Sequence, residues 1–307
     1  MSAAGGASTA VVHLVRRANG LEPFEAFLTS YGRHHSGHDH ELVLLFKGFD
    51  SEDQLAPYQR RAADLAEDAL SVPDSGFDLT AYLAAAQQLR HERLCFLNSY
   101  AQILVPGWLR LLSSALDRPE AGVAGATGSW GSHRSFALSL LRLPNGYRGA
   151  LGDPAEVGPA LRSVSPARDF GLTRRVLRAA RDIPRVVAGH PGFPAPHVRT
   201  NAFLLERELL LSLRAGRLGT KSAAYRFESG HKGLTEQLCQ RNMTPFVVGR
   251  GGEPLPPERW PDADVFWQGN QQELLVGDNQ TRAYQEGDPT ARAALARYAW
   301  GTRARPG

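Results

Sequence analysis

The chain has 307 residues, of which 42% are hydrophobic and 21% are charged, a balance that is ordinary for a soluble globular enzyme. No run of about 18 apolar residues occurs, so the sequence predicts no transmembrane helix. The formal net charge of +4 is too small to indicate a nucleic-acid-binding protein. The two cysteines, Cys95 and Cys239, lie far apart in apolar segments, so we expect no disulfide and a cytoplasmic location.

The first 130 residues alternate short apolar runs with amphipathic segments. This pattern predicts strands over residues 10–15, 42–46, 94–97 and 122–126, and helices over residues 22–31, 58–70, 78–92 and 108–116. Asp78 or Thr80 is expected to cap the third of these helices. Strands and helices that alternate through short connections indicate an α/β fold, with a Rossmann-like, mostly parallel sheet sandwiched by helices.

Polar residues follow each predicted strand where it ends. They are Arg16, Lys47 to Phe49, Asn98 to Tyr100, and Thr127 to Trp130. In parallel sheets ligands bind beyond the carboxyl ends of the strands, so we expect these tips to form one binding crevice. The chain contains neither GxGxxG nor GxxxxGK[ST], which excludes a dinucleotide fingerprint and a P-loop as its basis.

The second half of the chain starts with a different pattern. A helical insert is expected over residues 131–190, and it includes a basic amphipathic helix over residues 170–185, rich in Arg. That helix is either a solvated face or a peripheral contact with an anionic membrane surface. Beyond the insert we expect a strand in residues 199–207, a helix over 208–213, one helix within 225–242, a strand over 245–249 and a helix over 289–300.

Five segments, read in order, resemble a GT-A glycosyltransferase, nearest to the family 2 type. "VVHLVRRANG" and "ELVLLFKGFD" are similar to that family's first two strands, and "LCFLNSYAQILVPGWLRLL" to its strand, Asp-x-Asp motif and following helix. "RTNAFLLERELL" and "YRFESGHKGLTEQLCQRNMTPFVVG" resemble the start of the acceptor half and the segment with the catalytic base. The resemblance implies one GT-A-like domain over 1–307, with a nucleotide-sugar half (10–130), the helical insert (131–190), an acceptor half (191–287) and a C-terminal helix and tail (288–307).

The resemblance also implies an activity and a set of site residues. The activity is inverting transfer of a sugar from a nucleoside diphosphate donor to a hydroxyl, in surface-glycan or glycosylated-metabolite synthesis, with Glu228 as general base. Asp278, Asp262 and Asp264 are the next candidates for the base. The donor would contact Leu14, Arg16, Lys47, Phe49, Asn98, Ser99 and Tyr100, and the other substrate contacts would be Trp130, Arg199, Asn201 and Asp278.

The metal site is where the sequence departs from the family. The Asp-x-Asp carboxylates of the family hold Mg²⁺ or Mn²⁺, hard cations that prefer carboxylate oxygen, whereas this chain has Asn98-Ser99-Tyr100. We therefore expect the metal to be weakly held or absent. Lys47, Arg16 and Arg199 are expected to neutralise the diphosphate instead, and no metal ligand is assigned.

Two other functions remain open from the sequence. A catalytically inactive GT-A-like nucleotide-binding or scaffold protein would explain the missing carboxylates, and a nucleotidyltransferase would share the sheet and the nucleotide crevice. Trp130 is either a sugar-stacking residue or part of the core. The histidine-rich segment 34–40 matches no zinc-ligand spacing, so it is expected to be a solvated loop.

Overall fold

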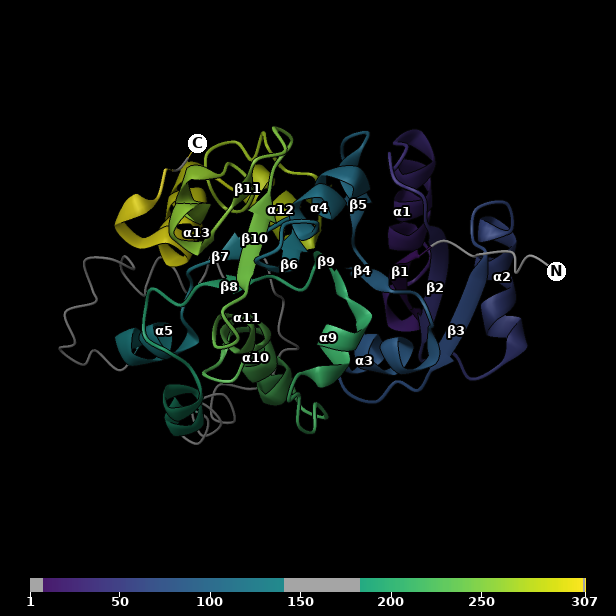
Figure 1. The fold of residues 1–307 in the computed structure, drawn as a ribbon, viewed down its shortest axis with the longest axis horizontal. Coiled ribbons are helices and arrows are strands. Elements are labelled where there is room, and N and C mark those ends of the chain that lie inside the picture. The colour runs from purple at the N-terminus through teal and green to yellow at the C-terminus, as the bar shows by residue number, and fades with distance from the viewer. Residues whose placement is uncertain (1–7, 141–182, 306) are drawn as a thin grey trace.

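The computed structural model describes residues 8–140, 183–305 and 307, and Figure 1 shows their arrangement. The centre is an eight-stranded sheet with the strand order β11-β10-β6-β9-β4-β1-β2-β3. Its strands are β1 (Thr9–Arg16), β2 (Glu41–Lys47), β3 (Asp68–Val72), β4 (Arg93–Leu97), β6 (Ala121–Gly125), β9 (Ala202–Glu206), β10 (Thr244–Val248) and β11 (Pro254–Leu255).

Most of these strands are parallel. β1 pairs in parallel with β2 and β4, β2 with β3, and β6 with β10, while β9 and β11 run antiparallel to their neighbours. Two short antiparallel pairs lie outside this sheet, β5 (Gln102–Ile103) with β12 (Val276–Gly277), and β7 (Gly128–Ser129) with β8 (His197–Val198). The predicted α/β fold with a mostly parallel sheet is confirmed.

Helices cover both faces of the sheet. The core cluster on one face includes residues of α1 (Glu22–Arg33), α2 (Glu52–Ala62) and α4 (Trp108–Leu116). The cluster on the other face includes residues of α3 (Asp78–Gln88), α9 (Arg207–Ser212), α10 (Lys221–Ser229), α11 (Leu234–Cys239) and α13 (Pro289–Trp300). In Figure 1 α1 and α4 lie in the upper half of the view, and α3 and α9 lie in the lower half.

The central strands are largely apolar because both of their faces are buried, although β1 also contains the buried His13. In β1, Val11 and Val15 belong to the core cluster with α1, whereas Val12 and Leu14 belong to the cluster with α3. The other labelled elements are the helices α5 (His133–Leu140) and α12 (Asn279–Glu286), and the short 3₁₀ turns η1 (Arg17–Asn19), η2 (Pro257–Asp262) and η3 (Gly301–Arg303).

The helix predicted over residues 58–70 is wrong in its bounds. Helix α2 spans Glu52–Ala62, and residues 68–72 form the edge strand β3. The residues of β3 are exposed or half-buried, so this strand lacks the continuous apolar run that identified the central strands. At the start of α3 the cap residue is Phe77, whose N–H donates to Thr80 Oγ1 at 3.4 Å, and Asp78 is the first helical residue.

The second half differs from the prediction in one segment. Residues 225–242 contain parts of two helices, α10 and α11, rather than one, and Glu228 lies in the last turn of α10. In the predicted helical insert, α5 and residues 183–189 are helical. The Arg-rich segment 170–185 lies outside the described residues up to residue 182. Among the described helices, none is long and apolar enough to cross a membrane.

Candidate functional site: two cavities that share one wall

A cavity of about 390 Å³ lies beyond the carboxyl ends of β1 and β4. From β1 the chain continues outward to β2 and β3, and then returns to place β4 on the other side of β1. Such a reversal of strand order opens a crevice at the carboxyl ends, where α/β proteins bind ligands. This first cavity is lined by Arg16, Asn19, Phe77, Asp78, Leu79, Asn98, Ser99, Tyr100, Arg199, Thr200, Asn201, Lys221, Ala224, Tyr225, Glu228, Asn279 and Gln280.

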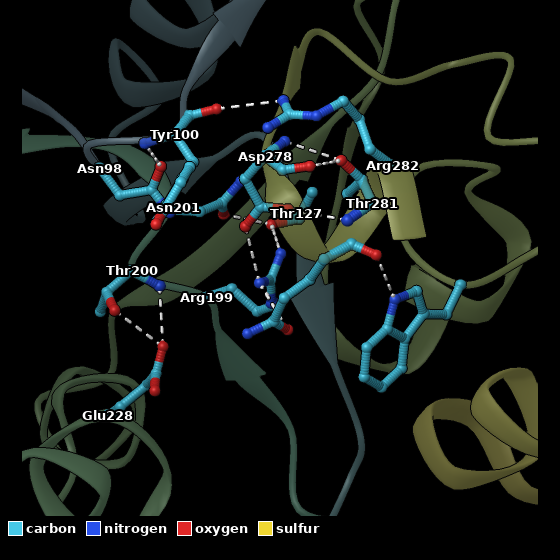
Figure 2. A network of polar contacts seen from close by, with 12 residues as sticks. Asn98, Tyr100, Thr127, Arg199, Thr200, Asn201, Glu228, Asp278, Thr281 and Arg282 are labelled. Carbon is cyan, nitrogen blue, oxygen red and sulfur yellow. Dashed lines mark hydrogen bonds and ion pairs between the residues drawn. The ribbon is translucent and has the colours of Figure 1, made fainter. Parts of the chain in front are cut away.

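The antiparallel direction of β9 brings a second segment to the same edge. Because β9 runs opposite to β4, the residues that precede β9 lie beside those that follow β4. The N–H of Asn98 donates to the carbonyl of Asn201 at 2.8 Å, which joins the two segments directly. Residues 199–201 and 98–100 therefore form one continuous wall (Figure 2).

The tip of β4 presents hydrogen-bond donors rather than carboxylates. The Asn98 side-chain carbonyl, Oδ1, accepts from the N–H of Tyr100 at 3.1 Å. A backbone N–H can only donate, so this contact fixes the orientation of the Asn98 amide and leaves its NH₂ for a ligand. The hydroxyl of Ser99 accepts from Asn19 Nδ2 at 2.7 Å. The tip is therefore suited to an anion.

These residues do not fit a Mg²⁺ or Mn²⁺ ion at the position of the Asp-x-Asp motif. The Asn98 oxygen is uncharged and already accepts a hydrogen bond, whereas these cations prefer several carboxylate oxygens. Asp278 is committed elsewhere, because one of its oxygens accepts from the N–H of Thr281 at 2.9 Å and the other from Arg199 at 2.9 Å. Within the part of the chain that the structure describes, no three His, Cys, Asp or Glu side chains form a metal-binding group.

Arg199 and Asp278 form a buried ion pair, with the two residues 8% and 1% exposed. Arg199 also donates to Thr127 Oγ1 at 3.3 Å and to Gln280 Oε1 at 3.0 Å, and its guanidinium lies 4.0 Å from the centre of the Phe266 ring. Burial alone would raise the pKa of Asp278, but Arg199 and the hydrogen bonds from Thr281 outweigh burial and lower that pKa. This pair fixes the wall between the β9 segment and α12 (Figure 2).

Asn201 offers the first cavity a further donor. Its side chain is 3% exposed, and its oxygen accepts from Thr127 Oγ1 at 2.5 Å. Its Nδ2 has no hydrogen-bond partner among the described residues, although the residue lines the cavity. Buried polar atoms nearly always have a partner in the protein, in water or in a ligand. Asn201 Nδ2 is therefore placed to bind a ligand oxygen or a water molecule.

The charged side chains of the first cavity come from different elements of the fold. Arg16 ends β1 and lies near Asp78, while Lys221 and Glu228 come from α10. Burial raises the pKa of Asp78, and Lys47 and Arg16 oppose that rise. Lys47 itself is 1% exposed and donates to the carbonyl of Gly76 at 2.8 Å, so it lies behind the wall as a charge partner of Asp78.

Glu228 is held in place by one neighbour. Its Oε1 accepts both the N–H of Thr200 at 2.9 Å and the Thr200 hydroxyl at 2.8 Å, as Figure 2 shows. These two bonds orient the carboxylate and leave Oε2 for other partners. Glu228 lines the first cavity and also a second one.

The second cavity measures about 300 Å³ and shares Arg199, Tyr225, Glu228 and Gln280 with the first. Its other lining residues are Ser129, His133, Phe136, His197, Phe266, Trp267 and Tyr298. Burial lowers the pKa of His133 to about 3 and also lowers the pKa of His197, which Glu228 partly opposes. Both imidazoles are therefore neutral at pH 7.

The structure brings together seven of the residues chosen from the sequence. Arg16, Asn98, Ser99, Tyr100, Arg199, Asn201 and Glu228 all line the first cavity. Five others, Leu14, Lys47, Phe49, Trp130 and Asp278, line neither cavity. Leu14 belongs to the core cluster on the α3 face, the Phe49 ring packs against Tyr58, and the Trp130 indole donates to the carbonyl of Pro257 at 2.8 Å.

Asp262 and Asp264, the other candidates for the general base, also line neither cavity. Asp262 pairs with Arg303 at 2.7 Å, and Asp264 accepts from the N–H of Gln271 at 3.2 Å.

Several residues that line the two cavities were not chosen as site residues from the sequence. They are Asn19, Phe77, Asp78, Thr200, Lys221, Tyr225, Gln280, His133, His197, Phe266, Trp267 and Tyr298. Asp78 and Gln280 had a usable signal, because each lies at the start of a helix that faces the strand tips.

Comparison of the sequence with protein-family models finds no match, and no curated protein matches it significantly. Among solved structures, the chain is similar to S. aureus TarS 1–349 in complex with UDP-GlcNAc, with a TM-score of 0.31 and 16% identity over 38% of this chain and 33% of that chain. It is also similar to GalNAc-T7 with UDP, GalNAc and Mn²⁺, with a TM-score of 0.31 and 14% identity over 40% of this chain and 23% of that one. The matches thus span a third of those chains or less, and at this TM-score they carry no conclusion about activity, substrate or metal.

Proposed function

We propose that this chain is a GT-A-like inverting glycosyltransferase, which moves a sugar from a nucleoside diphosphate donor to a hydroxyl acceptor. The observation that carries the proposal is the position of Glu228, whose carboxylate lines two adjoining cavities at the carboxyl ends of the sheet. A general base has to reach the proton that it removes. A carboxylate on a shared wall can contact an acceptor in one cavity beside the reacting carbon of a donor in the other.

The first cavity suits the donor. Arg16 and Lys221 supply positive charge, and Asn98 and Asn201 supply amide donors. Hydrogen bonds from such groups to phosphate oxygens are among the stronger ones in proteins, particularly those from Arg. In this proposal Asn98, which begins the segment where the resemblance implies metal-binding carboxylates, and Asn201 both donate to the diphosphate.

The chemistry then needs one proton transfer. Glu228 Oε2 takes the proton of the acceptor hydroxyl while that oxygen attacks the anomeric carbon. The bond from the anomeric carbon to the diphosphate breaks, and its electron pair leaves with the nucleoside diphosphate. Attack opposite the leaving group inverts the configuration at the anomeric carbon. Synthesis of a surface glycan or of a glycosylated metabolite is the setting that we propose.

The test combines binding with turnover. Uridine, guanosine and thymidine diphosphates and their sugars would be titrated by calorimetry with Mn²⁺ and with EDTA, and diphosphate release would be followed with acceptors. We expect one nucleotide to bind with less than about a tenfold change on metal removal, or about 1.4 kcal/mol. Glu228→Gln should lower turnover by roughly 10² to 10⁴ at unchanged donor affinity. Glu236→Gln, an exposed glutamate on α11, is the matched control.

Three other outcomes would each contradict a part of this proposal. Retention of more than about a third of the turnover in Glu228→Gln would contradict general-base catalysis by this residue, which is expected to contribute far more. Nucleotide binding without transfer to any acceptor would indicate an inactive nucleotide-binding protein. Release of pyrophosphate from a nucleoside triphosphate and a sugar phosphate would identify a nucleotidyltransferase.

A further inference from the structure

The second cavity has the chemistry of a binding site for an uncharged ring. Five of its lining side chains are aromatic, from Phe136, Tyr225, Phe266, Trp267 and Tyr298. Phe266 and Trp267 stack with their ring centres 4.4 Å apart, and Trp267 lies 6.3 Å from Tyr298. Its volume of about 300 Å³ is at the lower end for ligand sites. A site of this size has room for one ring rather than for a long lipid or a polymer segment.

Trp267 is held against this cavity in a strained conformation. Its φ is +46°, in the left-handed region that a bulky residue rarely adopts. Two hydrogen bonds fix it there, from its N–H to Gln271 Oε1 at 3.1 Å and from its indole to the carbonyl of Gln280 at 3.2 Å. Strain of this kind persists where the surroundings over-determine the residue, and it clusters at ligand-binding sites.

The polar groups of the second cavity can match hydroxyls. The Nδ1 of His197 donates to the carbonyl of Ala195 at 2.8 Å, so in the neutral imidazole Nε2 is an acceptor. Ser129 Oγ accepts from the N–H of Gly131 at 2.9 Å, which leaves its own hydrogen to donate. A hydroxyl both donates and accepts, so it can satisfy either kind of partner.

The charges of this cavity disfavour an ionic ligand. Arg199 is already matched by Asp278 and covered by the Phe266 ring, while the Glu228 carboxylate would repel an anion. Burial keeps His133 and His197 neutral, and a cation would have to exchange its water shell for aromatic walls and the single carboxylate of Glu228, which is costly.

We propose that the second cavity binds the acceptor as a single uncharged pyranose ring, with a ring face on Trp267 and Tyr298 and one hydroxyl at Glu228. A pyranose carries C–H bonds on its faces and hydroxyls around its rim, which matches aromatic walls with a few neutral polar groups. The proposal rests on the proposed function only in taking Glu228 as the base; the binding of the ring does not require a donor or turnover.

The experiment measures binding of methyl glycosides to the whole chain by ligand-observed NMR. The panel holds the neutral methyl glucoside, galactoside, mannoside and N-acetylglucosaminide, together with an anionic methyl glucuronide and a cationic methyl glucosaminide. We expect at least one neutral member to bind in the millimolar range, at least about tenfold tighter than both charged rings. Tighter binding of a charged ring, or no binding of any neutral member while a nucleoside diphosphate binds, would overturn the proposal.

Three conservative variants locate the bound ring. Trp267→Phe should weaken the neutral glycoside about threefold to tenfold, and Tyr298→Phe, which removes only a hydroxyl, should weaken it about threefold. Trp130→Phe is the matched control, because Trp130 lines neither cavity. Nucleoside diphosphate affinity should stay unchanged in all three. Equal losses in Trp267→Phe and Trp130→Phe would overturn this location.

Discussion

The two cavities share a wall but differ in how they bind. The first is built from strand tips and helix ends, and it carries Arg16, Lys221, Asp78 and amide donors. The second is built from the short β7 and β8 strands, the helices α5, α10, α12 and α13 and the loop that carries Phe266 and Trp267, and its walls are mostly aromatic rings and neutral imidazoles. One region is therefore suited to recognising charge and the other to recognising shape. Glu228 stands where the two meet.

Two carboxylates near the shared wall, those of Asp278 and Glu228, differ in how many of their oxygens are already bonded. Asp278 is 1% exposed, with both oxygens bonded to Arg199 and Thr281. Glu228 has one oxygen bonded to Thr200 and lines both cavities. The first carboxylate is fixed as part of the structure, and the second is the one that we propose as the general base. The same functional group thus serves structure or chemistry according to how many of its lone pairs are already used.

The largest effect is expected from Asp278→Asn, which tests whether the shared wall depends on the buried pair. Asn can still cap α12, but it leaves the Arg199 charge buried without a counter-ion. Removing one partner of a buried pair costs about 3–5 kcal/mol. We therefore expect the free energy of unfolding, measured in urea, to fall by that amount.

The matched control is Asp262→Asn, which removes the partner of Arg303 in an exposed pair at 2.7 Å. Exposed ion pairs contribute about 0–1 kcal/mol, so this variant should be close to wild type. If the two variants lose equal stability, the Arg199–Asp278 pair is not the structural support of the wall.

The strands that could be predicted from the sequence are those that form a continuous apolar run. β1, β2 and β4 are buried on both faces and read as apolar runs, so their polar ends, Arg16 and Asn98, were found with them. β3 is largely exposed at the sheet edge, and it carried no such signal. The antiparallel direction of β9 depends on its neighbours β4 and β6, which a local pattern does not record.

The second cavity was invisible in the sequence for a related reason. Its lining residues come from segments near 129–136, 197–199, 225–228, 266–267, 280 and 298, and each aromatic residue alone reads as core. Trp130, for which the sequence left a sugar-stacking role and a core role open, lines neither cavity, whereas Trp267 lines the second one. Only the packing of the chain distinguishes the two tryptophans.

A second prediction tests the charge of the first cavity through Arg16→Ala. Arg16 is half-buried at the end of β1 and lines the cavity. Hydrogen bonds to charged groups contribute about 1.5–3 kcal/mol, so calorimetry should show nucleoside diphosphate binding weakened by that amount. Binding of the nucleoside alone should change little, because it lacks the phosphate charge.

The neighbouring Arg17 provides the control for Arg16. Arg17 is exposed, pairs with Asp50 at 3.3 Å and lines neither cavity, so Arg17→Ala should bind the diphosphate like wild type. Equal losses for diphosphate and nucleoside in Arg16→Ala would show that Arg16 shapes the base-binding end of the cavity rather than contacting phosphate.

The smallest effect at neutral pH is expected from an acid titration that separates the second cavity from the buried Arg199–Asp278 pair. Burial lowers the pKa of His133 from 6.5 to about 3, so between these values the unfolded chain binds a proton that the native chain does not. The free energy of unfolding should therefore fall as the pH falls from 6.5 towards 3, by up to about 1.4 kcal/mol per pH unit for this histidine. The pKa of Asp278 is lowered from 3.8, so the stability from its pair with Arg199 is present above pH 3.8 and is lost only below it. As the pH falls, the histidine of the second cavity is thus expected to lower the stability first.

In urea titrations, His133→Phe should flatten the slope of stability against pH between pH 6.5 and 4 by up to about 1.4 kcal/mol per pH unit, whereas Asp278→Asn should leave that slope unchanged. Parallel curves for His133→Phe and wild type over this range would show that His133 takes up its proton as readily in the native chain as in the unfolded one, and that the second cavity is not neutral in acid.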